Sequence, residues 1–208
     1  MCSSTSILAL LLGLSQFCSA ALLKIYANAA YDNSFGEVFE MVPNELTAAV
    51  GDVLEFHFTG PGLGVLGGNH SVAMGDFNSP CMPAREGFFS GYMGVNATSK
   101  EADQVFQVDV TNTDPMVFYC TQGRHCAMGM YGVVNGAGGQ TRKAYKDKIP
   151  TTNLFAMAPD FVGGGTLLPN NATNILGPSI FDGAASPKSL SSTTALVFGL
   201  AAALMIAQ

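Results

Sequence analysis

Apolar and polar residues alternate along several short segments in the first two thirds of the chain. In segment 53–58 the apolar side chains Leu54, Phe56 and Phe58 share one face of an extended strand, while His57 lies on the other face, which we expect to meet solvent. Similar alternation or short apolar runs between turns mark the segments 22–26, 105–110, 115–119 and 131–134. No helical periodicity of more than a few residues interrupts them. The pattern predicts an all-β sandwich or barrel.

The pattern changes after residue 135. A glycine-rich stretch at 136–139 ends the last predicted strand, and residues 140–148 have the composition of one short helix. Residues 150–180 are rich in Gly, Pro, Asn and Thr and show little periodicity. We therefore expect residues 137–183 to form a short helix followed by a disordered stalk.

The first twenty residues have the features of a secretory signal. They carry no charged side chain, they contain an apolar run at 7–14, and Cys18-Ser19-Ala20 is a small-x-small cleavage pattern. The apolar run is too short for a membrane-spanning helix. We expect residues 1–20 to be a signal peptide.

The opposite end combines small residues, a polar spacer at 186–194 and an apolar terminus at 195–207. This order is typical of a GPI-attachment signal, whose tail is removed when the lipid is attached. Gly183 is the expected attachment residue, with 184–186 as rivals and 184–208 as the propeptide. The alternative is a tail anchor, but such a helix needs about 20 apolar residues. Both ends predict an extracellular, cell-surface protein that contacts the membrane through its GPI lipid alone.

Charge and cysteine content narrow the remaining possibilities. Residues 21–183 contain eight basic and fifteen acidic side chains, a net charge of −7, and the chain has no tryptophan. Without a basic cluster beyond 142–148, it is a poor nucleic-acid binder. Three cysteines remain after signal cleavage, namely Cys81, Cys120 and Cys126. In an oxidising compartment an odd number predicts one disulfide and one thiol that is buried, paired with another chain or bound to a metal.

Cys120, His125 and Met130 follow each other with the spacing C-x4-H-x4-M. A thiolate, an imidazole and a thioether on one loop suit a soft copper ion better than magnesium or calcium. A trigonal copper plane needs a second imidazole. His70 is the stronger candidate because it follows a Gly-rich stretch, whereas His57 lies inside a strand.

Three pieces of the sequence together resemble the fungal extracellular cupredoxins, which are similar to plant phytocyanins and often GPI-anchored. These pieces are 69–72 (Asn-His-Ser-Val), 77–81 (Phe-Asn-Ser-Pro-Cys) and the ligand loop 118–130. The resemblance implies a Greek-key β-sandwich over residues 21–136 that holds one type 1 copper ion. It also implies that the copper ligands are His70, Cys120, His125 and Met130, and that Cys81 and Cys126 form a disulfide. Met128 competes with Met130 for the axial position.

Three Asn-x-Ser/Thr sequons begin at Asn69, Asn96 and Asn171. We expect Asn69, beside the ligand His70, to be buried and to bond to the backbone near Cys120 or Thr121. A buried Asn69 would carry no sugar, which leaves Asn96 and Asn171 as the expected glycosylation sites.

The motifs favour a monomeric one-electron carrier that exchanges electrons with an unidentified partner at the cell surface. The alternative is a copper-binding module that buffers, delivers or senses the metal. Zinc in the site, or a disulfide-bonded β-domain with an incidental thiol, are the blander interpretations. Enzymatic readings have less support. Three histidines are too few for a trinuclear copper centre, cleavage after Ala20 exposes no amino-terminal histidine, and a Cys120–His125 protease dyad would need a cleft.

Overall fold

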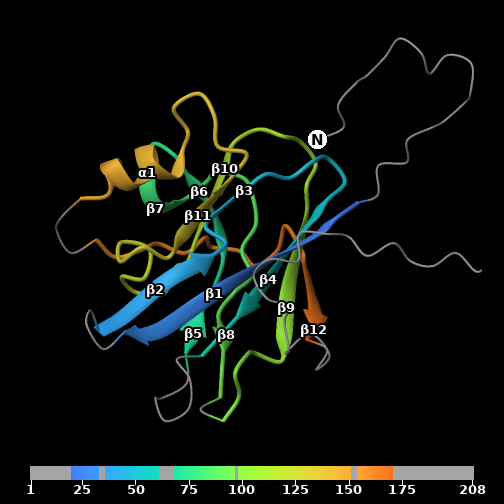
Figure 1. The fold of residues 1–208 in the computed structure, drawn as a ribbon, viewed down its shortest axis with the longest axis vertical. Helices are drawn as coiled ribbons and strands as arrows, with labels where there is room; N and C mark the ends of the chain where they lie inside the picture. Colours follow the sequence, from blue (N-terminus) through green and yellow to red (C-terminus); the bar gives the residue numbers. More distant parts are fainter. Residues whose placement is uncertain (1–19, 33–35, 61–67, 97, 151–153, 171–208) are drawn as a thin grey trace, which may run out of the picture. The chain divides into compact units, whose positions relative to one another are not determined.

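Two five-stranded sheets form the centre of the protein (Figure 1). The computed structural model describes residues 20–32, 36–60, 68–96, 98–150 and 154–170. The expected signal peptide, Asn171, the attachment residue Gly183 and the propeptide lie outside these residues.

The strand order in each sheet joins segments that are far apart in the sequence. The first sheet has the order β12 (Thr166–Pro169), β9 (Gln104–Asp109), β4 (Val53–Phe58), β1 (Leu22–Asp32), β2 (Gly36–Val42). The second has the order β3 (Glu45–Leu46), β11 (Tyr131–Val134), β10 (Met116–Tyr119), β6 (Ala73–Asp76), β7 (Ser79–Pro83). A separate short pair consists of β5 (Asn69–His70) and β8 (Met93–Gly94). The predicted β-sandwich is confirmed.

The main core lies between the two sheets. Leu54, Phe56 and Phe58 on β4 are completely buried, as their alternation predicted. Phe56 meets Phe118 of β10 edge-to-face at 5.3 Å between ring centroids, which ties the first sheet to the second. Full burial of such a side chain contributes about 1.5–3 kcal/mol, so this face of β4 stabilises the contact between the sheets.

His57 departs from the sequence-based expectation, because it is completely buried instead of meeting solvent. Its Nε2 lies 2.8 Å from Glu55 Oε1 and its Nδ1 lies 2.9 Å from Glu101 Oε2, while Tyr26 stacks on the ring. Burial lowers the pKa of His57, but the hydrogen bonds that its ring donates to Glu101 and Glu55 outweigh this effect, and the net pKa is raised. The prediction was wrong because two carboxylates allow a charged imidazole to be buried.

The segment after residue 136 also differs from the expected stalk. The predicted helix is present as α1 (Arg142–Lys148), whose first turn is capped by a hydrogen bond from the Ala144 N–H to Thr141 Oγ1 at 3.1 Å. Residues 154–158 then run across the second sheet, and their inward side chains pack on a second core that includes Tyr119, Tyr131 and Tyr145. The inward side chains of this strap are those of Leu154, Ala156 and Ala158.

The chain next returns to the first sheet. Strand β12 pairs antiparallel with β9, from Thr166 opposite Gln107 to Pro169 opposite Gln104. The C-terminal segment thus packs on one sheet and extends the other, so the expectation of disorder was wrong for residues 154–170. The sequence did not predict the ordered structure of this segment, because Gly and Pro residues interrupt any alternation of apolar and polar positions.

Within the described part of the chain, no helix is long and apolar enough to cross a membrane.

Candidate metal centre

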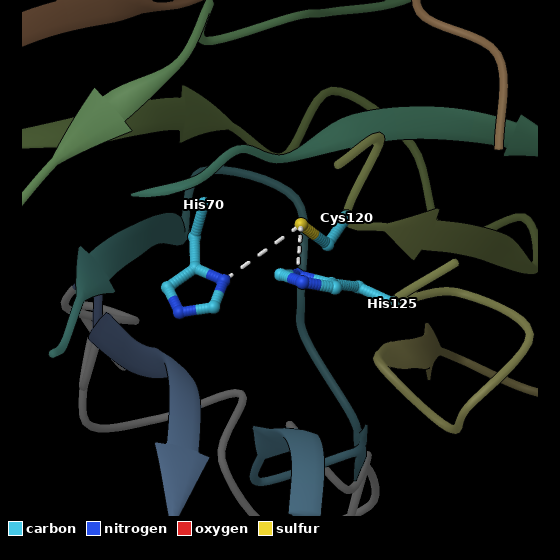
Figure 2. Close-up of side chains that lie close together, drawn as sticks. All are labelled: His70, Cys120 and His125. Carbon is cyan, nitrogen blue, oxygen red and sulfur yellow. Dashed lines mark hydrogen bonds between the residues drawn. The ribbon is translucent and has the colours of Figure 1, made fainter. Parts of the chain in front are cut away.

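Three side chains from separate elements converge on one point (Figure 2). His70 ends β5, Cys120 directly follows β10, and His125 lies in the loop between β10 and β11. Cys120 Sγ lies 3.6 Å from His125 Nδ1 and 3.9 Å from His70 Nδ1. Among the described residues, these three form the one cluster of His, Cys, Asp or Glu donors close enough to share a metal ion.

The spacing of these donor atoms fits a first-row transition metal. Thiolate and imidazole bonds to zinc are about 2.3 and 2.0 Å long, so donors about 110–120° apart on one ion would be separated by about 3.5–3.7 Å. The observed sulfur–nitrogen distances of 3.6 and 3.9 Å lie close to this value. The three donor atoms therefore lie at the separations that a shared metal ion requires.

The loop that carries Cys120 and His125 is held by its own backbone. The Cys120 N–H donates to the Met130 carbonyl at 3.0 Å, which closes the base of the loop. Inside it, the His125 N–H donates to Gln122 and the Met130 N–H donates to His125, both at 2.9 Å. Gly129 has φ +120°, a conformation that side chains with a Cβ rarely adopt. These bonds fix the position of the ligands along the loop.

Burial distinguishes the two methionines of the loop. Met130 is completely buried in the main core, directly after the turn that His125 begins. Met128 is 49% exposed. Met130 is therefore the better placed axial donor, and its role as a ligand stays a prediction.

The donors differ in how far they reach solvent. His70 and Cys120 are buried, whereas His125 is partly exposed. Burial, with a smaller contribution from His125, lowers the pKa of His70 to about 4, and burial lowers the pKa of His125 to about 4. Burial also raises the pKa of the Cys120 thiol. At neutral pH both imidazoles are thus uncharged, the form that binds metals, while metal binding must displace the thiol proton.

Ser71, and not Asn69, connects the segment of His70 to that of Cys120. Ser71 Oγ accepts a hydrogen bond from the Thr121 N–H at 2.9 Å and lies 2.7 Å from Thr121 Oγ1. It also lies 3.9 Å from Cys120 Sγ. The expectation that Asn69 is buried was wrong, since the side chain is exposed. Neighbouring side chains of a strand point to opposite faces, and His70 takes the inner one in β5.

The exposure of Asn69 removes the reason for expecting that sequon to be bare. Asn96 is exposed as well, so burial does not separate these two sites. Glycosylation of Asn96 stays a prediction, and Asn171 lies outside the described residues.

Phe39 is a component of the site that sequence reasoning missed. Its ring stacks on His125 at 3.9 Å between centroids with an interplanar angle of 22°, and meets the edge of His70 at 6.4 Å. Phe39 lies on β2, which is paired with β1. No local pattern marked it, because only the pairing of β1 with β2 brings it to the ligand loop. Stacking restricts the rotation of the His125 ring.

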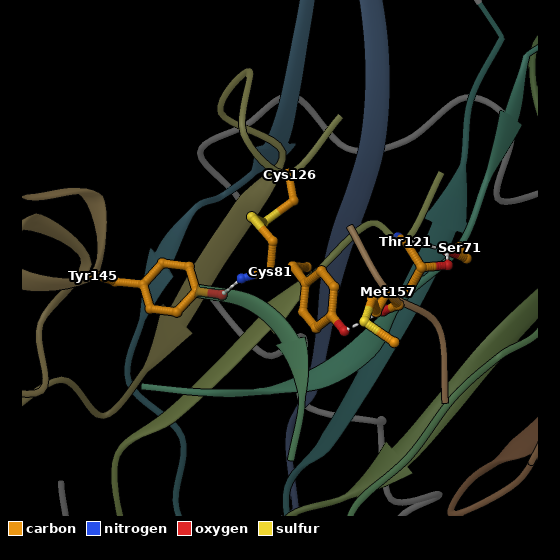
Figure 3. The surroundings of a disulfide bond; sticks show 7 residues. Ser71, Cys81, Thr121, Cys126, Tyr145 and Met157 are labelled. Atoms are coloured by element: carbon orange, nitrogen blue, oxygen red, sulfur yellow. Dashed lines mark hydrogen bonds between the residues drawn. A yellow bond between two sulfur atoms is a disulfide. The ribbon is translucent and has the colours of Figure 1, made fainter. Parts of the chain in front are cut away.

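A disulfide between Cys81 and Cys126 confirms the implied pairing. It joins β7 to the residue directly after His125 (Figure 3). The Cys81 N–H donates to the Tyr145 hydroxyl at 2.7 Å, so α1 also contacts this junction. Among the described residues, Cys120 is the free cysteine. The disulfide therefore fixes the ligand loop while leaving one thiol for the metal.

Comparison with known proteins decides the family. No family model matches the chain. A protein of Arthroderma benhamiae described as a probable GPI-anchored cupredoxin-1 is 32% identical over 164 residues, which cover 78% of this chain and 76% of that protein. The chain belongs to the cupredoxin family. A second relative from the same organism, described as an extracellular serine-rich protein, is 31% identical to this cupredoxin over 74% of its length. The match spans only 57% of that longer relative.

Solved structures of similar proteins include blue-copper proteins. The auracyanin of Roseiflexus castenholzii has a TM-score of 0.37 and 15% identity, covering 58% of this cupredoxin and 99% of the auracyanin. The plastocyanin of Dryopteris crassirhizoma has a TM-score of 0.31 and 16% identity, covering 53% and 96%. Scores this low leave the fold to be judged from the strand order itself.

Family and geometry agree on the metal. Thiolate and imidazole donors at these distances also suit zinc, and membership of the cupredoxins decides for copper. The descriptions of the relatives agree with both terminal signals, and the protein is extracellular and GPI-anchored.

Proposed function

We propose that this cupredoxin is a one-electron carrier at the cell surface, with a type 1 copper held by His70, Cys120 and His125 and by Met130 as axial ligand. The observation that supports this most strongly is the convergence of the three donor atoms on one point. A type 1 copper ion in such a site would supply one-electron redox chemistry.

The residues around the donors would keep them in place when a bound copper ion gains or loses an electron. The Ser71–Thr121 contacts hold the segments of His70 and Cys120 together. The disulfide holds the loop directly after His125, and Phe39 stacks on the His125 ring. Fixed ligands need little rearrangement when an electron arrives or leaves, and such outer contacts tune a metal site. These features favour rapid electron transfer.

The partly exposed His125 is the proposed route for the electron. His70 and Cys120 have almost no accessible surface, so a partner would approach the metal most closely past the His125 ring. The same burial leaves little room for a substrate at the metal, which supports a carrier over an enzyme.

Spectroscopy of the copper-loaded mature protein, residues 21–183, tests the ligand set. We expect an intense visible band and a narrow copper hyperfine splitting in the EPR spectrum. Cys120→Ser should abolish both, because the band arises from the copper–thiolate bond. Met128→Leu is the matched control and should keep the blue colour, while Met130→Leu should change the spectrum. A colourless wild-type protein in copper(II) would contradict the proposal.

The rate of electron exchange distinguishes a carrier from a copper-handling module. A carrier should exchange electrons rapidly between its two oxidation states and hold its copper against a chelator. Slow exchange with ready transfer of copper to the chelator would favour buffering or delivery instead.

A further inference from the structure

The last described residue, Asn170, is held at a fixed place on the first sheet. Its N–H donates to the Asp103 carbonyl at 2.8 Å, and its Nδ2 donates to Glu101 Oε2 at 2.8 Å and to the Ala102 carbonyl at 3.0 Å. It follows directly on β12, which is paired with β9. Asn170 is therefore the exit point, the fixed place at which the segment toward the GPI lipid begins.

Strand register places this exit at the same end of the sandwich as the metal site. Pro169 lies opposite Gln104, and β4 and β9 run antiparallel, so Asn170 is level with the end of β4. Phe39, which stacks on His125, pairs with Ala29, two positions beyond the last β1–β4 pair. Figure 1 shows the tips of β1 and β12 and the β5–β8 pair at the lower end of the molecule.

The short β5–β8 region connects the two places directly. A Cβ at Gly68 would lie 3.2 Å from Nε2 of the ligand His70 and 3.3 Å from the Thr59 carbonyl. Thr59 in turn forms a β-bridge with Glu101, the residue that holds Asn170. The metal site and the exit point are thus neighbours at one end.

The opposite end of the sandwich is made by other residues. There the Ala21 N–H donates to Asp52 Oδ1. Asp52 lies in the turn before β4, which also contains Val50, a residue that is 64% exposed. From Val53 to Thr59 the strand direction covers six residues, or about 20 Å at about 3.3 Å per residue. The two ends of the sandwich are therefore far enough apart for their distances from a membrane to be distinguished.

The chain between Asn170 and the expected attachment residue Gly183 is thirteen residues long, which reaches at most about 45 Å. If the metal end of the domain faces the lipid, the chain has no need to reverse its direction, and its whole length is free to span the gap to the membrane. The opposite orientation requires the chain to turn back and run about 20 Å along the domain, close to half of its reach. Restricting a chain in this way costs conformational entropy.

The geometry points to a copper end that faces the anchoring membrane, so that the electron partner is a protein embedded in that membrane. The inference rests on the expected anchor and on the proposed carrier role. The partly exposed His125 and the 49% exposed Met128 then meet that partner across a narrow space. A soluble partner would have to enter between the domain and the lipid.

Fluorescence transfer from tryptophan to a dansyl-labelled phospholipid measures this orientation. The chain has no tryptophan, so a single introduced one reports its own position. Asn69→Trp, at an exposed site beside His70, marks the copper end. Val50→Trp marks the far end and is made together with Asn69→Gln, so that both proteins lack the same sequon. The GPI-anchored proteins are reconstituted in phosphatidylcholine vesicles that contain the labelled lipid.

We expect at least twofold more efficient transfer from the Asn69→Trp protein than from the Val50→Trp protein. Inserting about thirty Gly and Ser residues after Asn170 should remove the difference, because a long linker permits both orientations. Equal transfer with the native linker, or more efficient transfer from the Val50→Trp protein, would overturn the inference.

Two controls distinguish a failure of the inferred orientation from a failure of the expected lipid anchor or of the proposed carrier role. Phosphatidylinositol-specific phospholipase C should abolish transfer in both proteins, and persistent transfer after release would overturn the inference. If no lipid anchor is present, neither protein binds the vesicles and the inference fails with it. The measurement needs no copper, so failure of the carrier role would show in the visible and EPR spectra instead.

Discussion

Single hydroxyl and ring contacts decide how the three metal donors are positioned. Ser71 joins the segments that carry His70 and Cys120, and Phe39 lies flat on His125. Asn69, next to His70 in the sequence, contributes an exposed side chain. Of the two sequence neighbours of His70, Ser71 therefore supports the site and Asn69 does not, because only Ser71 is buried. A buried polar side chain supports a site when it forms a hydrogen bond with another buried polar group.

Replacing Ser71 by Ala tests this assignment. The Thr121 N–H would lose its acceptor in a buried position, and an unsatisfied buried donor costs about 1–3 kcal/mol. We expect the free energy of unfolding of the apoprotein to fall by this amount in urea titrations. Asn69→Ala is the matched control and should change it by less than about 0.5 kcal/mol. Equal effects of the two substitutions would contradict the assignment.

At the scale of elements, the C-terminal segment is part of the domain. Helix α1 and the strap at 154–158 cover the outer face of the second sheet, and β12 extends the first. The Tyr119 hydroxyl donates to the Met157 carbonyl at 2.6 Å, so the strap is bonded to the residue that precedes Cys120. The element that sequence composition classified as a stalk thus stabilises the ligand strand.

Truncation distinguishes a stalk from a structural segment. A mature protein that ends at residue 136, the predicted domain boundary, would expose the buried rings of Tyr119 and Tyr131. Burial of each such side chain stabilises the protein by about 1.5–3 kcal/mol, and exposing the two rings forfeits most of this. We expect this truncation to lower the melting temperature by at least 10 °C and to increase binding of a hydrophobic dye. A protein that ends at residue 170 should behave like the full mature chain.

At the scale of the whole molecule, the buried His57 and His70 and the partly buried His125 give the apoprotein a pH-dependent stability. His70 and His125 have a pKa of about 4 when folded and an ordinary value near 6.5 when unfolded. Between these values the unfolded chain binds more protons, so stability rises with pH. His57 acts in the opposite sense, because its raised pKa gives stability that is complete below about 6.5 and lost as pH rises through the folded value.

Urea unfolding of the apoprotein at several pH values measures these contributions. We expect the unfolding midpoint to fall as pH drops from about 6.5 to about 4. The double substitution His70→Gln with His125→Gln should flatten this slope, and His57→Gln should leave it in place. A slope that persists without His70 and His125 would assign it to other groups. The lowered pKa values of Glu55 and Glu101 add a loss of stability at still lower pH.

The sequence alone predicted the class of fold and one cysteine left over for a metal, because these depend on local alternation and on residue types that few chemistries share. The pairing of Cys81 with Cys126 and the full set of donors came from the resemblance to the cupredoxins. The alternation of β4 predicted its buried face, and the odd cysteine predicted a free thiol. The burial of His57, the stacking of Phe39 and the packing of residues 154–170 became visible in the folded protein alone. Each of these depends on segments that are distant in the sequence, and hydrogen bonds or packing across that distance leave no periodic signal in either segment.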